Sequence, residues 1–160
     1  MDEINHAASL MIIEGRGNGM FDPDSDVTRQ EAVTMFMRAI GEMVNYDIAI
    51  AMGAACGLID AETPNATAMT RIATAELIVN ALRYLGMEPT MTLEDAVAIL
   101  EEFTDLGDLT DEEMIVMAIC VELGIFRGAG EGLMNPNDVL QRSQMASLAV
   151  RLQDVILGIE

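Results

Sequence analysis

The sequence predicts an all-α protein built around one aliphatic core. Hydrophobic residues make up 51% of the 160 residues while aromatic residues contribute only 4%, with no Trp. Ala, Leu, Met and Glu are strong helix formers, and the aromatic and β-branched enrichment that is typical of strands is thin. Apolar side chains also recur at the i, i+3, i+4 and i+7 spacing of a helix face, as at Val33, Phe36, Met37 and Ile40. A chain of this length can bury such a core without metals or disulfides.

Seven helices are expected, near residues 2–14, 28–43, 46–57, 70–85, 93–103, 110–124 and 141–157. The first ends where glycines follow an apolar run, which is a C-terminal stop signal. The second begins at Thr28, which forms a Thr-x-x-Glu capping box with Glu31. The third ends at Gly57, and the fourth begins at the Thr70-Arg71 segment.

A linker is expected between the fourth and fifth helices, over residues 86–92, where Gly86 and Pro89 interrupt the chain. Thr92 and Thr110 are placed as N-caps of the fifth and sixth helices, because a threonine hydroxyl can accept from an N–H group of the first turn. The seventh helix is expected to begin at Gln141.

The chain is strongly acidic, with 27 acidic residues against 8 basic ones and a formal net charge of -19. Every basic residue is Arg, and the sequence contains no Lys. Such a field repels nucleic acid and anionic membranes, so neither is expected as a partner. A solvated acidic surface that serves solubility or a salty habitat explains the charge more simply than a cationic ligand does.

Neither a membrane span nor a signal peptide is expected within this sequence. The longest apolar stretches are interrupted within about ten residues, against the ~20 that are needed to span a bilayer. The opening MDEINHAAS carries acids where a signal peptide carries a basic region, so an export signal is expected to lie outside this chain.

Side chains for catalysis or metal binding are scarce. His6 is the single histidine, which leaves little for a His-based triad or a metal cluster. Cys56 and Cys120 lie in apolar helical patterns without the paired spacing of a zinc or redox site, so we expect core thiols. The loop from Asp22 has the acids of a calcium-binding loop, but Val27 stands where that loop needs Gly, which favours a capped helix entry. No cofactor and no enzymatic activity are expected.

The chain contains an internal repeat. A shift of 113 residues lays MIIEGRGNGMFDPDSDVTRQEAVTMFMR, from Met11, over GIFRGAGEGLMNPNDVLQRSQMASLAVR, from Gly124, without a gap. The identical residues include turn-forming residues and one cation, namely Gly15 with Gly128, Gly17 with Gly130, Gly19 with Gly132, Pro23 with Pro136, and Arg29 with Arg142. Both segments end at an arginine, Arg38 and Arg151.

A weaker third segment, GLIDAETPNATAMTRIATAELIVNALRYLG from Gly57, lies between the other two and has Arg71 at the place of the repeated arginine. We name the segments copy one (from Met11), copy two (from Gly57) and copy three (from Gly124), and we call Arg29, Arg71 and Arg142 the motif arginines. A single domain over residues 1–160 is expected, with repeats at about 1–43, 45–86 and 103–158 and with residues 87–102 as a linker and helix.

These segments resemble the S-layer-homology (SLH) domain family. Its repeats carry a Gly-Ile-x-x-Gly-x-Gly-x-Gly-x-Phe-x-Pro loop and then an (Ile/Leu/Met)-Thr-Arg-Ala-Glu helix start, matched here by IIEGRGNGMFDPDSDVTRQE, AMTRIATAE and GIFRGAGEGLMNPNDVLQRSQ. FTDLGDLTDEEMIVMAI, from Phe103, is similar to the Phe-x-Asp opening of a repeat. The resemblance implies three helix-loop-helix repeats in a pseudo-threefold helical prism.

The resemblance also implies a function at the bacterial cell wall or S-layer. Such domains attach exported proteins to the wall without a covalent bond, by binding a secondary cell-wall polysaccharide, often bearing a pyruvate ketal, in grooves between repeats. The ligand-binding residues that it implies are Arg29, Arg71 and Arg142 as cations, Glu31 and Gln144 as hydrogen-bonding neighbours, and Gly15 and Gly128 in the loops. A guanidinium can bind a carboxylate through two parallel N–H bonds, and a helix N-terminus also favours an anion.

Three alternatives stay open. The protein could be an interaction scaffold in a surface assembly that includes neighbouring surface-layer subunits, or it could bind a polyamine-modified peptidoglycan, which suits an acidic surface without lysine. The motif arginines could instead brace neighbouring repeats through carboxylates. Copy two lacks the glycine loop and the acidic fourth place of the motif, and copy three lacks the threonine cap, so copy one is expected to be the most intact.

Overall fold

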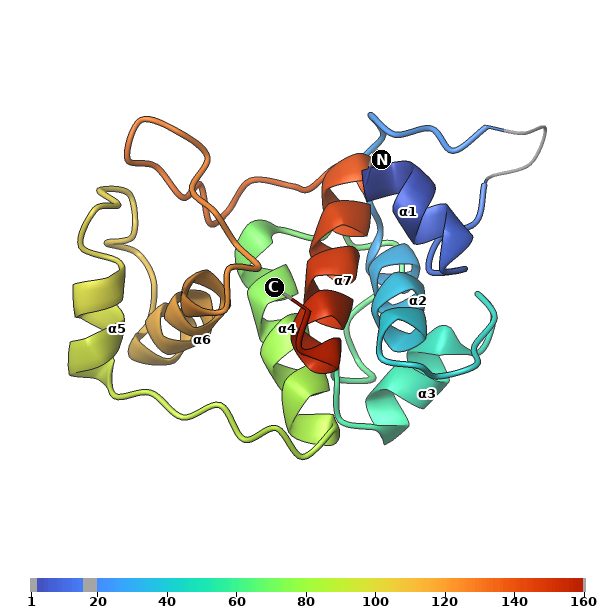
Figure 1. Ribbon diagram of the computed structural model, residues 1–160, viewed down its shortest axis with the longest axis horizontal. Helices are drawn as coiled ribbons and strands as arrows, with labels where there is room; N and C mark the ends of the chain where they lie inside the picture. The colour runs from blue at the N-terminus through green and yellow to red at the C-terminus, as the bar shows by residue number, and fades with distance from the viewer. Residues whose placement is uncertain (1–2, 16–19, 160) are drawn as a thin grey trace.

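The computed structural model describes residues 3–15 and 20–159. It contains helices α1 (Glu3–Ser9), α2 (Arg29–Ala39), α3 (Ala49–Ala55), α4 (Arg71–Tyr84), α5 (Leu93–Ile99), α6 (Asp111–Glu122) and α7 (Arg142–Leu157) (Figure 1). Strand-like pairing within these ranges is limited to isolated bridges. The prediction of an all-α protein is therefore confirmed, and each expected helix is present.

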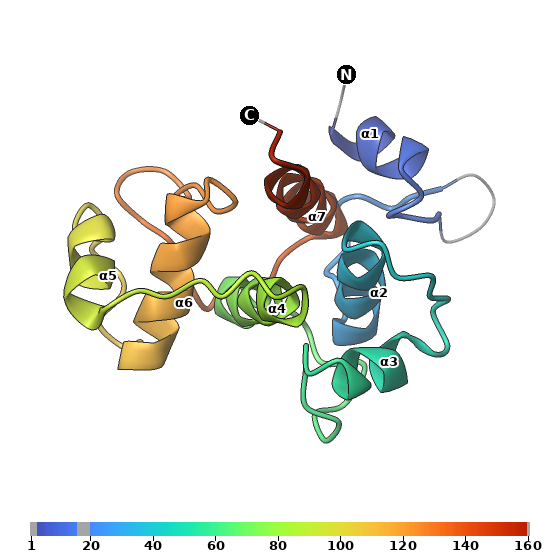
Figure 2. The same cartoon turned by 60° about the horizontal axis from the view of Figure 1, so that its bottom comes forward.

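The second helix of each copy lies at the centre of the molecule. Figure 1 shows α7 between α2 and α4, while α5 and α6 extend to one side. Each of the three central helices carries one neighbour: α3 packs on α2, α6 on α4, and α1 on α7 (Figure 2). Helix α5 packs on α6, and the segment at 87–92 that joins it to α4 is not helical. The first and last helices of the chain are thus in contact.

The predicted N-caps are present. The Thr28 N–H group donates to Glu31 Oε2 at 3.0 Å, and the Glu31 N–H group donates to Thr28 Oγ1 at 3.3 Å, which completes the capping box of α2. Thr110 and Glu113 form the same box at the start of α6. Thr92 Oγ1 accepts the Asp95 N–H group at 3.1 Å. These bonds satisfy N–H groups that a helix start leaves without a partner.

Several helices are shorter than the apolar pattern predicts. Helix α1 ends at Ser9, and not near residue 14, because Met11 adopts a left-handed conformation with φ of 57°. The Met11 N–H group donates to Ala8 O and the Ile12 N–H group to Ala7 O, which is the Schellman arrangement of a helix end. Gly57 and Gly124, at the equivalent places of copies two and three, are also left-handed.

Other ends also differ from prediction. Helix α2 ends at Ala39, and not near 43, because Gly41 turns the chain with φ of 91°. Helix α3 begins at Ala49, and not near 46, since Asn45 Oδ1 accepts the N–H groups of Asp47 and Ile48 in a turn. Helix α5 ends at Ile99, four residues before the predicted end.

The starts of α2, α4 and α7 are joined in a closed cycle of backbone hydrogen bonds. Val27 donates to Leu140 O at 3.0 Å, Leu140 to Met69 O at 2.9 Å, and Met69 to Val27 O at 3.1 Å. These three residues hold equivalent places, each two residues before a motif arginine. The motif arginines extend the cycle, because their own N–H groups donate to Thr67 O, Asp138 O and Ser25 O. Apart from this cycle, the helical prism of three repeats and the boundaries of those repeats stay predictions.

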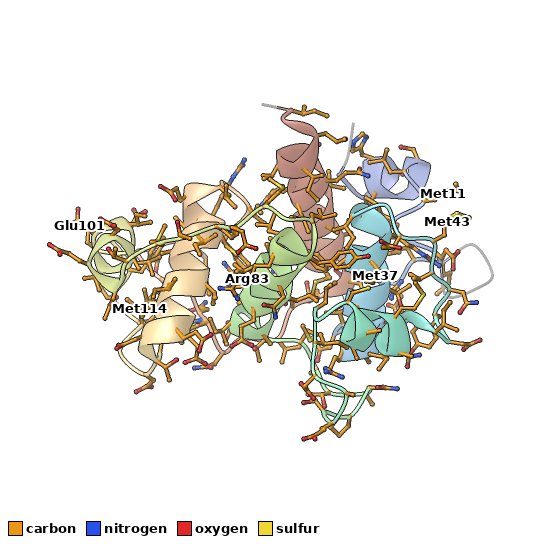
Figure 3. All side chains as sticks on the ribbon, turned by 90° about the horizontal axis from the view of Figure 1, so that it is seen from below. Met11, Met37, Met43, Arg83, Glu101 and Met114 are labelled. Carbon is orange, nitrogen blue, oxygen red and sulfur yellow. The ribbon has the colours of Figure 1, made fainter. Side chains whose placement is uncertain are left out.

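The core is aliphatic, as composition predicts, with Phe36 and Phe126 among its largest fully buried side chains. The methionines divide between two environments: Met37 is fully buried, whereas Met43 is 95% exposed beside Met11 at the edge of the molecule (Figure 3). Both cysteines are free thiols, as expected, and burial raises the pKa of the Cys120 thiol. None of the described helices is both long and apolar enough to cross a membrane.

Candidate functional site

Each motif arginine begins a central helix and reaches into the loop of another copy. In each loop, one main-chain carbonyl oxygen accepts a hydrogen bond from the guanidinium. It belongs to the residue three positions after the first residue of the copy, which is Met11, Gly57 or Gly124. The three bonds run from Arg29 to Asp60 O, from Arg71 to Arg127 O and from Arg142 to Glu14 O. The three arginines are therefore structurally equivalent, and each joins two copies.

Arg142 is held mainly by a buried ion pair. Its Nη1 lies 2.7 Å from Glu31 Oε1, and the two side chains are 4% and 12% exposed. Nε donates to Phe21 O at 3.0 Å, and the guanidinium carbon lies 4.7 Å from the centre of the Phe21 ring. Glu31 therefore uses one oxygen to cap α2 and the other to bind Arg142. This arrangement matches the bracing role that the sequence left open.

Arg29 is equally enclosed by the loop of copy two. Nη1 donates to Thr63 O at 2.9 Å, and Nη2 lies 3.1 Å from Asp60 Oδ2. Backbone N–H groups of Thr63 and Glu62 lower the pKa of Asp60 to about 2, and the charge of Arg29 makes a smaller contribution in the same direction. Asp60 is thus ionised at all physiological pH values and neutralises Arg29.

Arg71 has weaker partners. It is half-buried, stacks 4.9 Å from the centre of the Phe126 ring, and donates from Nη2 to Arg127 O at 3.2 Å and to Met134 Sδ at 3.4 Å. Its Nε is buried without a hydrogen-bond partner among the described residues, and no carboxylate there forms an ion pair with it. Burial lowers the pKa of Arg71, against the charges of Asp138 and Asp105. An unpaired buried N–H group is costly and favours an added acceptor.

A groove lies beside each motif arginine. Groove 1, of about 340 Å³, includes Glu14, Gly15, Glu31, Arg38, Tyr46 and Arg142 in its lining. Groove 2, of about 450 Å³, includes Arg29, Asp60, Thr63, Glu76, Leu77 and Asn80. Groove 3, of about 150 Å³, includes Arg71, Phe126, Arg127, Gln144, Ser147 and Arg151. All three are formed by one loop, one central helix and the motif arginine of another copy.

The other residues that the sequence singled out fall in different places. Glu31 and Gly15 line groove 1, and Gln144 lines groove 3, where its Oε1 accepts the Gln141 N–H group at 2.9 Å. Gly128 does not line a groove: a Cβ atom there would lie 2.6 Å from Phe103 Cε1. Gly17 and Gly19 of the repeated loop lie outside the described residues.

Three arginines of the grooves were not predicted from the sequence, namely Arg38, Arg127 and Arg151. The overlay of copies one and three contains a signal for two of them, because it pairs Arg38 with Arg151. Arg127 has no such signal, since the overlay pairs it with Glu14. The two residues differ in charge at one structural position.

The sequence profile of the S-layer homology domain matches residues 1–33 and 102–146. The chain belongs to the S-layer homology family. The matched segments contain the motif arginines of copies one and three, Arg29 and Arg142, and the Phe103 opening. No curated protein matches the chain.

S-layer homology domains are binding domains and are not catalytic. They generally anchor proteins to the cell wall, where they bind wall polymers, and the proteins that carry them are typically associated with the cell surface. The described part of this chain contains no group of three or more His, Cys, Asp or Glu residues placed to hold a metal ion.

Proposed function

We propose that this S-layer homology protein attaches an exported protein to the bacterial cell wall by binding an acidic secondary cell-wall polysaccharide in its grooves. The observation that carries the proposal is the placement of the motif arginines, each at the start of a central helix and beside a groove. A carboxylate such as a pyruvate ketal suits this position, because a guanidinium can bind a carboxylate through two parallel N–H bonds.

The acidity of the protein does not prevent this binding. At physiological salt the Debye length is ~8 Å, so carboxylates elsewhere on the surface are largely screened from a groove. A local arginine in a half-buried site is screened much less. A polymer with repeated acidic groups could also engage more than one chain in a surface layer, which raises avidity without strengthening any one contact.

Groove 2 supports a second candidate ligand, a cationic group such as the polyamine of a modified peptidoglycan. The lining of groove 2 contains Asp60 and Glu76, while its one arginine is already paired with Asp60. Burial raises the pKa of Glu76, and the nearby carboxylates of Glu113 and Glu112 raise it further, so two more negative charges act on Glu76. A bound cation would reduce the repulsion between these carboxylates.

Retention on purified wall sacculi tests the proposal. The protein should bind native sacculi and should lose binding after acid treatment that strips the polysaccharide, because the proposed ligand is then gone. Arg71→Ala should weaken binding by about 1.5–3 kcal/mol, the value of hydrogen bonds to a charged group. Arg83→Ala is the matched control, since Arg83 is exposed on α4 and outside the linings of the three grooves.

Two results would contradict the proposal. Equal binding to native and stripped sacculi would exclude the polysaccharide as the ligand, and would favour peptidoglycan or a protein partner. Equal weakening by Arg71→Ala and Arg83→Ala would show that total charge, and not a groove, determines retention.

A further inference from the structure

The three grooves differ in charge at one loop position. This position carries the carbonyl that accepts from the motif arginine, and its side chain is Glu14 in groove 1, Asp60 in groove 2 and Arg127 in groove 3. Glu14 lies 3.2 Å from Arg38, and Asp60 lies 3.1 Å from Arg29. Each of these carboxylates thereby neutralises an arginine of its own groove.

The grooves also differ in charge at a second position, on the first turn of the central helix. Glu31 occupies it in groove 1 and Gln144 in groove 3, while copy two has Ala73. The Glu31 carboxylate contacts Arg142 at 2.7 Å and so takes the place that a ligand carboxylate would need. Gln144 is neutral and cannot form in groove 3 the ion pair that Glu31 forms with Arg142 in groove 1.

One turn further along the central helix, groove 2 has an acidic residue where grooves 1 and 3 have a neutral one. Glu76 lies at the position of Thr34 in groove 1 and Ser147 in groove 3. Counted over the described residues, two arginines and two carboxylates therefore balance in the lining of groove 1, and two carboxylates exceed one arginine in groove 2. Groove 3 has Arg71, Arg127 and Arg151 and no carboxylate in its lining.

We infer that, among the described residues, groove 3 is the anion-binding groove, and that Arg127 is the residue that selects it. The inference rests on the proposed function and names the groove at which it operates. An acidic group in groove 3 meets three guanidinium groups and the unpaired Nε of Arg71. In groove 1 the same group would have to displace the Glu31 carboxylate from a buried ion pair, which is unfavourable.

The size of groove 3 limits what enters it. Ligand pockets usually enclose 300–1,000 Å³, whereas groove 3 encloses about 150 Å³. It can therefore hold a charged substituent, such as the carboxylate of a ketal, while the sugar ring remains outside. One acidic substituent per chain is the stoichiometry that follows.

A charge reversal at Arg127 tests the inference on purified sacculi. Arg127→Glu gives groove 3 the loop side chain of groove 1, and should weaken retention of the full chain at least tenfold. Arg127→Gln, which removes the charge without reversing it, should weaken retention by a smaller factor. Arg83→Glu is the control, because it changes the net charge as much as Arg127→Glu does and lies outside the grooves.

The variants should fold normally, since the Arg127 side chain is exposed and forms no ion pair within the described residues. Unchanged far-UV circular dichroism would verify this. Retention of Arg127→Glu equal to that of the unmodified chain would overturn the inference and leave the proposed function intact. Failure of the unmodified chain to bind sacculi would overturn the proposed function itself, and the inference with it.

Discussion

Glu31→Ala should cost far more stability than removal of an ordinary capping residue. Glu31 Oε2 accepts the Thr28 N–H group at 3.0 Å and Oε1 accepts from Arg142 at 2.7 Å, so one substitution removes two interactions. Loss of a cap costs about 1 kcal/mol. Removing one partner of a buried ion pair costs about 3–5 kcal/mol. Because Arg142 keeps the carbonyl groups of Phe21 and Glu14, the lower limit applies, and a total of about 4 kcal/mol is expected.

Glu113→Ala is the matched control, because it removes the same capping box from α6. Glu113 Oε2 accepts the Thr110 N–H group at 2.7 Å but forms no ion pair within the described residues. Its loss should cost at most about 1 kcal/mol, since it also relieves repulsion of Glu76. The two variants should therefore differ by about 3 kcal/mol, or by about 6–12 °C in Tm at this chain length.

Urea unfolding followed by circular dichroism at 222 nm measures this difference, and suits a protein without Trp. The slope of the unfolding free energy against urea should be the same for both variants, so that midpoints can be compared. A difference below about 1 kcal/mol would refute the reasoning, because the Arg142 to Glu31 contact would then add nothing beyond the cap.

Two further substitutions test the backbone and the charge of groove 2. Met11→Gly should stabilise the protein by up to about 1 kcal/mol in the same urea assay. The reason is that Met11 has a left-handed backbone at the place where the other copies have Gly57 and Gly124. An unchanged or lower urea midpoint would exclude strain at Met11. Glu76→Gln should stabilise the protein more at pH 7 than at pH 4. Burial and the charge of Glu113 raise the pKa of Glu76, so its ionisation is opposed in the folded state. The stability of the unmodified protein therefore falls as the pH rises through that pKa. An equal effect at both pH values would contradict the raised pKa.

The sequence was sufficient to predict the helices and their starts, because those depend on local signals. Thr28 with Glu31 and Thr110 with Glu113 form capping boxes within four residues of chain, and the structure contains both. Helix ends were predicted less well. The apolar run after Ser9 continues the helical pattern, yet Met11 turns left-handed so that Ile12 can enter the core.

The grooves could be predicted only in part, because each of them combines residues from different copies. The sequence identifies Arg142 as a cation at a helix start, but its contacts with Phe21 and Glu14 depend on the order of the copies in space. For the same reason Arg127 carried no signal of its own. Its importance becomes visible only when the three equivalent loop positions are superposed.

The cycle of backbone bonds through Val27, Leu140 and Met69 makes this domain unlike an open solenoid. In a linear array each unit contacts only its neighbours, so the ends can fray while the middle persists. Here the first and last units are also neighbours, since α1 packs on α7. Opening the junction between any two copies breaks the cycle of hydrogen bonds to which the other two junctions also belong. Unfolding should therefore proceed as one cooperative event. A domain with one junction open and the other two intact is therefore not expected to persist.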